Sequence, residues 1–164
     1  MYNMIEGQRP SGIGERRESL NLLPEEARKI RDHAVTLATN FEIDGCVVVC
    51  DRNGLELCFD SVGSNLSQWY AHKARGKVIT VRISHKSTTE VDEIYRKQNI
   101  DPSHLMDTKG NAIPGGMPIF DKEADGTFIG AAAFHCEDPD EDNDYFIGEA
   151  IKRAGFFFNT RKPI

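Results

Sequence analysis

Residues 45–59 read GCVVVCDRNGLELCF, which is the pattern of two strands joined by a tight turn. The first half is a continuous apolar run from Cys46 to Cys50, as expected of a strand that is covered on both faces. The second half alternates Leu55, Leu57 and Phe59 with polar residues and a cysteine, as expected of a strand with one wetter face. Between the halves, Asn-Gly at 53–54 is a strong hairpin signal because both residues tolerate a positive φ. A central β-hairpin therefore predicts a sheet against which the rest of the chain packs.

Length and charge limit the class of protein. The chain has 164 residues, about one domain's worth and enough to bury a core without a metal or a disulfide. Its 26 acidic and 20 basic residues give a formal net charge of −6, which argues against a nucleic-acid binder with a basic face. No apolar run could span a bilayer, and the N-terminus has charges where a signal peptide needs an apolar stretch. We therefore expect a cytoplasmic protein that binds neither nucleic acid nor membranes.

The cysteines and the acidic segment do not predict a metal site. No C-x-x-C pair occurs among Cys46, Cys50, Cys58 and Cys136, and three of the four lie in the predicted hairpin, which favours buried, reduced thiols. The acids of residues 138–149 nearly satisfy a calcium-loop pattern, but Asn143 stands where that loop needs a glycine. We expect this segment to be a solvated helix start.

Periodicity predicts a single domain, residues 22–164, preceded by an N-terminal arm, residues 1–21. Apolar residues at helical spacing predict helices over 23–41, from residue 64 to about 81, and over 87–99, the last opened by the capping box Ser-Thr-Thr-Glu. The segment 100–112 is predicted to be a loop. Two more strands are expected over 117–121 and 127–135, followed by a last helix that Asp138 caps, with Pro139 at its first position and Tyr145 on its apolar side.

Several polar residues fall where they could line a site. Lys73 and Lys77 lie on the apolar face of the second helix, so each must reach solvent, pair with an acid or hold an anionic ligand. Gly115 and Gly116 stand between two prolines in a loop that either lets backbone amides approach a ligand or is simply a sharp turn. His33 lies at the edge of the apolar stripe of the first helix, facing solvent or a pocket rim.

The order of these features resembles the GlcG/HbpS family, which also includes the C-terminal domain of PduO-type corrinoid adenosyltransferases. The resemblance covers about residues 22–155 and rests on Asp51, Gly54, Ala71, Lys73, Ala74, Gly115, Gly116, Pro118, Gly130, Pro139 and Asp142. It implies an α+β fold with an antiparallel sheet of about five strands flanked by helices, assembled into a homo-oligomer. It also implies a kinship with members that bind haem or corrinoid and with others found beside catabolic enzymes.

Two departures from the family pattern lie around the presumed pocket. This chain has His135-Cys136-Glu137 where the family usually carries Ser-Gly-Gly, and it lacks the arginine that is common near the position of Cys58. His135 ends the strand of small residues and precedes the acidic segment. These departures make a specialised enzyme more plausible than it would be for a typical member.

We therefore predict a GlcG/HbpS-like small-ligand-binding protein whose ligand is haem or a related tetrapyrrole. In this reading His33, His135 or Cys136 ligates the iron and lysines meet the propionates.

The alternative is a cofactor-free enzyme, a hydrolase or isomerase acting on a carboxylated catabolic metabolite, with His135 and Lys73 as catalytic candidates. Lys73 and Lys77 would hold the carboxylate, the amides of Gly115 and Gly116 would stabilise an oxyanion, and His135 would titrate near its reference pKa of about 6.5. A purely structural partner protein is a third possibility.

Overall fold

The structure, a computed structural model, describes residues 20–64, 66–122, 126–138 and 140–158. Within them the elements follow in the order α1 (Pro24–Asn40), β1 (Gly45–Asp51), β2 (Glu56–Val62), α2 (Gln68–Ser84), α3 (Thr88–Lys97), the 3-10 helix η1 (Pro102–Thr108), β3 (Gly116–Phe120), β4 (Phe128–His135) and α4 (Asn143–Arg153). Most of the predicted arm lies outside the described residues, and no helix within them is long and apolar enough to cross a membrane.

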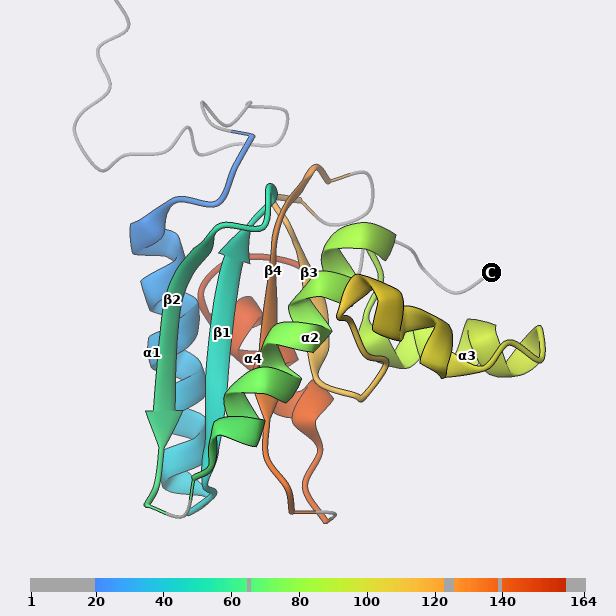
Figure 1. The fold of residues 1–164 in the computed structure, drawn as a ribbon. Coiled ribbons are helices and arrows are strands. Elements are labelled where there is room, and N and C mark those ends of the chain that lie inside the picture. The colour runs from blue at the N-terminus through green and yellow to red at the C-terminus, as the bar shows by residue number, and fades with distance from the viewer. Residues whose placement is uncertain (1–19, 65, 123–125, 139, 159–164) are drawn as a thin grey trace, which may run out of the picture.

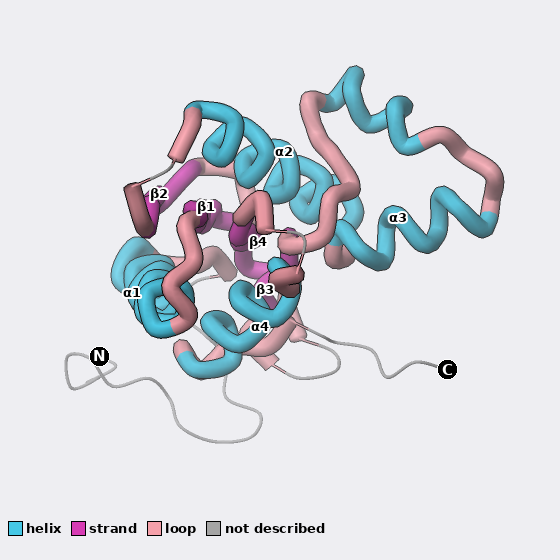
Figure 2. The backbone as a smooth tube through the Cα atoms, turned by 90° about the horizontal axis from the view of Figure 1, so that it is seen from below, coloured by secondary structure: helices cyan, strands magenta, loops and turns pink. Residues whose placement is uncertain are grey.

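The strands form one antiparallel sheet in the order β2-β1-β4-β3. Helices α1 and α4 cover one face of the sheet and α2 covers the other, while α3 and η1 lie beyond the β3 edge (Figures 1 and 2). This confirms the predicted α+β fold, with four strands in the described part of the chain where about five were expected.

The predicted hairpin is confirmed, and its first strand has the burial that its composition predicts. Every residue of β1 is buried because β1 lies inside the sheet between β2 and β4 and beneath a helix on each face. Val47 and Val49 pack in the core with α1 and α4, whereas Cys46, Val48 and Cys50 pack against α2. All four cysteines are free thiols.

The second strand differs from the predicted alternation. A β-bulge opposite the Val49–Cys50 step shifts the register, so that Leu57 and Cys58 both pack against the α1 side of the core. Leu55 is exposed in the turn, and Phe59 lies at the surface with the Arg75 guanidinium 4.8 Å above its ring. A bulge breaks the two-residue period on which the prediction depended.

Most of the predicted helices are confirmed, but α2 and α4 begin later than predicted. Helix α3 has the expected capping box, whereas η1 occupies a segment expected to be a loop. At α4 the capping side chain is Asp142, which accepts hydrogen bonds from the amides of Asp144 and Tyr145. Asp138 accepts the amide of Asp140 in a preceding turn, and the position of Pro139 lies outside the described residues. Tyr145 is exposed rather than on the buried side of the helix.

Candidate functional site

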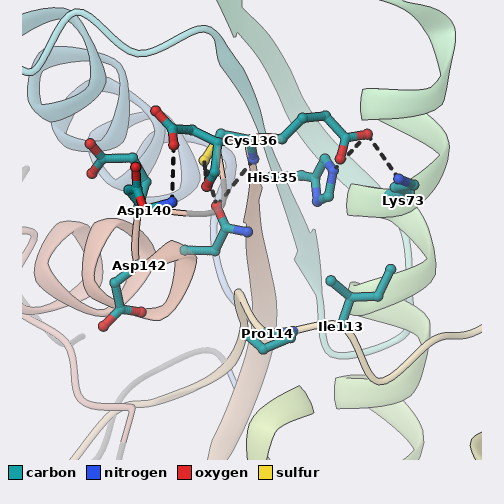
Figure 3. A pocket seen from close by; sticks show the side chains of 11 residues that line it. Lys73, Ile113, Pro114, His135, Cys136, Asp140 and Asp142 are labelled. Atoms are coloured by element: carbon teal, nitrogen blue, oxygen red, sulfur yellow. Dashed lines mark hydrogen bonds and ion pairs between the residues drawn. The ribbon is translucent and has the colours of Figure 1, made fainter.

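A pocket of about 510 Å³ opens where β4 ends and the chain crosses to α4 (Figure 3). Its walls come from α2, from the loop before β3 and from the segment between β4 and α4, which lie side by side because β4 is central in the sheet. The lining residues are Lys73, Ile113, Pro114, His135, Cys136, Glu137, Asp138, Asp140, Glu141, Asp142 and Asn143. Its volume is in the range usual for small-ligand sites.

His135 is the buried polar side chain of this pocket. Its side chain is 3% exposed, and neither ring nitrogen has a hydrogen-bond partner among the described residues. Its Nε2 atom lies 3.5 Å from Oε1 of Glu137, which is long for a hydrogen bond, and the edge of the Tyr70 ring packs against the imidazole. Because buried polar atoms are almost always paired, this imidazole is the feature of the pocket that most requires an explanation.

Glu137 joins His135 to α2. Its Oε1 atom accepts a hydrogen bond from Nζ of Lys73 at 2.8 Å, and both residues line the pocket. In the sequence, Glu137 stands out only as a departure from the family pattern, since its partner Lys73 is 64 residues away in the chain. The hydrogen bond from Lys73 is the main cause that lowers the pKa of the Glu137 carboxyl.

Burial lowers the pKa of His135 to about 4, and the positive charge of Lys77 adds to this effect, while Glu137 opposes it. This pKa lies below the value of about 6.5 expected for His135 as a general base. The imidazole is neutral at neutral pH and has one nitrogen with a free lone pair.

Lys77 is not on the pocket surface. It is fully buried, and its Nζ atom donates a hydrogen bond to the carbonyl oxygen of Phe134 at 2.8 Å. Burial lowers the pKa of this amine to about 7. The sequence left three possibilities for each lysine: reaching solvent, pairing with an acid or holding an anionic ligand. Lys73 pairs with an acid. Lys77 does none of the three, because its partner is a strand carbonyl.

The glycine loop is fixed by the protein itself. The amide of Gly115 donates to Oδ1 of Asp144 at 2.7 Å, and the amide of Gly116 donates to Oγ1 of Thr88 at 3.0 Å. Asp144 also accepts a hydrogen bond from the hydroxyl of Thr89. In this conformation neither glycine amide is free for an oxyanion. These hydrogen bonds hold the start of β3 against α3 and α4.

The other two candidate iron ligands differ in position. Cys136 lines the pocket, but its Sγ atom lies 3.1 Å from the side-chain oxygen of Asn143 and burial raises the pKa of the thiol. His33 is on α1, which covers the face of the sheet opposite α2, and it does not line this pocket. The structure therefore brings His135, Cys136 and Lys73 together and leaves His33 apart.

Carboxylates dominate the pocket charge. We name as the acidic rim the five residues Glu137, Asp138, Asp140, Glu141 and Asp142, against which Lys73 is the one lysine or arginine in the described lining. Within the described chain, no three His, Cys, Asp or Glu side chains are grouped so that they could hold a metal ion.

Comparison with known proteins identifies the relatives of this chain. The sequence model of a family described as haem-degrading protein HbpS-like matches residues 22–149. The chain belongs to this HbpS-like family. No curated protein matches the chain.

Several solved structures share the fold of this chain. A crystal structure titled as a PduOC:heme complex aligns with a TM-score of 0.70 and 16% identity over 85% of this chain and 99% of that chain. A double mutant of HbpS from Streptomyces reticuli aligns with a TM-score of 0.71 and 20% identity over 93% and 99%. The protein ORFY of Klebsiella pneumoniae aligns with a TM-score of 0.69 and 13% identity over 88% and 97%.

Proposed function

We propose that this HbpS-like protein binds a small ligand in the pocket at the end of β4, that the ligand is haem or a related tetrapyrrole, and that His135 is the iron ligand. The observation that carries this proposal is that neither ring nitrogen of the buried His135 has a hydrogen-bond partner among the described residues. The family description and the relative solved with haem support the choice of ligand.

The donor chemistry of His135 suits haem iron. Haem, when bound, would supply an iron centre that a neutral imidazole such as that of His135 could ligate. His135 stays neutral down to low pH, so that its lone pair is available without loss of a proton. Cys136 is the weaker candidate because its thiol is held near Asn143 and its pKa is raised.

Glu137 lies next to the ring nitrogen of His135 that a ligand would have to reach. Its carboxylate lies beside Nε2, and both ring nitrogens of His135 are hidden from solvent. The Glu137 side chain is 43% exposed and its ion pair with Lys73 is solvent-accessible, so opening this pair costs little.

Haem uptake by the purified protein tests the proposal. Titration with haem should give a Soret band of a bound, imidazole-ligated species, and His135→Ala should lose it. His33→Ala is the matched control, since it removes a histidine outside the pocket. A protein that takes up no haem, or a His135→Ala variant with the spectrum of the parent, would sink the proposal.

The cofactor-free enzyme remains the second candidate because Glu137 lies between His135 and Lys73, an arrangement that can orient a general acid or base. A colourless protein that takes up no added haem but turns over a carboxylated metabolite, with turnover abolished in His135→Ala and substrate binding kept, would favour this candidate.

We also propose that the chain forms a homo-oligomer, as the family resemblance implies. Strand β2 is at the edge of the described sheet, and the exposed large apolar side chains include Leu55, Trp69 and Ile83. Light scattering after size-exclusion chromatography should show more than one subunit, and a monomer at micromolar concentration would contradict this.

A further inference from the structure

We infer that the pocket recognises N–H donor groups of its ligand, such as an ammonium, amidinium or carboxamide group, at the acidic rim, and that the ligand's carboxylates stay outside it. This inference rests on the proposed function only in placing the ligand beside His135. The inference concerns the charge of those ligand groups that lie next to the acidic rim.

The rim has acceptors that the described residues leave free. The carboxylates of Asp140 and Glu141 make no hydrogen bond or ion pair with any described residue, and both line the pocket. The side chains of Asp138 and Asp142 each accept backbone amides but remain exposed, and Glu137 alone has a cation as its partner. The rim therefore presents a net negative charge to anything that enters.

The two lysines of α2 near the pocket already have hydrogen-bond partners within the protein. Lys73 is paired with Glu137, and Lys77 is buried behind the pocket wall, where it donates to a strand carbonyl. At the N-terminus of α4, Asp142 accepts two of the amides that would otherwise attract an anion. An incoming carboxylate would therefore meet like charge and find no free lysine or arginine among the described lining residues.

His135 is the independent sign that a ligand belongs here. Its ring nitrogens are buried, His135 is part of the pocket wall, and neither nitrogen has a hydrogen bond to a described residue, although Glu137 lies 3.5 Å from Nε2. A neutral imidazole offers one acceptor and one donor and adds no positive charge to offset the rim. In the close view His135 lies between Lys73 on one side and Asp140 and Asp142 on the other, so a ligand that reaches it lies next to the acidic rim (Figure 3).

If the ligand is a tetrapyrrole, the negative charge of the rim determines how the macrocycle is oriented and which of its substituents are preferred. Carboxylate side chains of the macrocycle would point away from the rim, and a macrocycle whose side chains there are amides would fit better than one with propionates. The lysine-bound propionates that sequence analysis expected therefore do not fit this pocket mouth.

A pair of probes with the same ring and opposite charge tests the inference without haem. Benzamidinium and benzoate are each titrated into the full chain at low salt, and the NMR resonances of the His135 ring are followed. Benzamidinium should shift them saturably, with an affinity at least about tenfold higher than that of benzoate, because charged hydrogen bonds replace charge repulsion.

The double variant Asp140→Asn with Glu141→Gln should bind benzamidinium about threefold to tenfold more weakly than the parent, as expected for the loss of two exposed charge pairs. Its affinity for benzoate should not fall. The matched control combines Glu25→Gln and Glu93→Gln, which remove the same charge from exposed positions on α1 and α3, outside the pocket. This control should bind benzamidinium like the parent.

Equal responses to the two probes, a preference for benzoate, or no response of His135 to either would overturn the inference. Haem uptake measured on the same samples tests the proposed function separately. If the protein prefers benzamidinium but takes up no haem, the inference about the rim stands and the proposal of a tetrapyrrole ligand fails. If the protein takes up haem but prefers benzoate, the proposal stands and the inference fails.

Discussion

The Nζ atom of Lys77 lies 2.8 Å from the carbonyl oxygen of Phe134, the residue that precedes His135. This contact ties the middle of α2 to the end of β4, and Lys77 is fully buried there. A buried ammonium is costly, so the pKa of Lys77 falls to about 7 and its charge helps to lower the pKa of His135.

Lys77→Met should change how stability depends on pH. Because the pKa of Lys77 is about 7 in the folded chain and 10.5 in its ordinary state, the unfolded chain binds one more proton between these values. The parent should therefore gain stability relative to Lys77→Met as pH rises from 7 towards 10.5, and below pH 7 the difference should be constant. Urea denaturation of both proteins from pH 6 to 10 measures it, and a difference that does not change with pH would contradict the burial of this amine.

His135 should stay neutral until the solution is strongly acidic. NMR titration of its ring should give a pKa of about 4, well below 6.5. The unfolded chain binds this proton first, so stability should fall as pH drops from 6.5 to 4, and His135→Gln should lack that part of the fall. In Lys77→Met the pKa of His135 should rise, since a nearby positive charge has been removed. Titration of His135 near 6.5 in the parent would show that the ring is not buried.

Gly115→Ala should destabilise the protein by about 2–4 kcal/mol, because φ is +117° and an added Cβ would lie 2.4 Å from the Phe134 carbonyl oxygen. Gly155→Ala is the matched control, with a φ of +92° and no atom within 4 Å of the added Cβ, so it should cost only about 1 kcal/mol. Thermal or urea unfolding compares the two, and equal losses would show that packing around Gly115 does not matter.

Glu137→Ala should uncover Nε2 of His135 and speed haem association, as measured by stopped-flow absorbance. Stability should fall by less than about 1 kcal/mol, because the ion pair with Lys73 is solvent-accessible. Glu25→Ala removes a charge from an exposed position on α1, outside the pocket, and serves as the control. If both variants associate with haem at the parental rate, Glu137 does not limit access.

Local sequence patterns predicted the helices and strands, whereas the candidate site is formed by contacts between residues far apart in the chain. The apolar run of β1 and the capping box of α3 are visible in the sequence because each depends on neighbouring residues. The start of α4 was misplaced because Asp138 followed by a proline resembles a cap as closely as Asp142 does, and only the backbone path distinguishes them.

The candidate site was predicted in part for the same reason. The position of His135 follows from its place at the end of a strand, whereas the partners of the two lysines do not follow from helical spacing. Lys73 finds Glu137 and Lys77 finds Phe134 across 64 and 57 residues, respectively. Spacing on α2 shows that both lysines face the sheet, but not which of its atoms they meet.

Imidazole rescue of a His135→Gly variant tests the central claim, that His135 holds haem iron, most directly. The variant leaves a space the size of the ring beside Glu137, which free imidazole can enter. We predict that the variant with haem lacks the spectrum of the parent and that millimolar imidazole restores it, while His33→Gly has the parental spectrum without imidazole. A His135→Gly variant that binds haem with the parental spectrum and affinity would contradict the account.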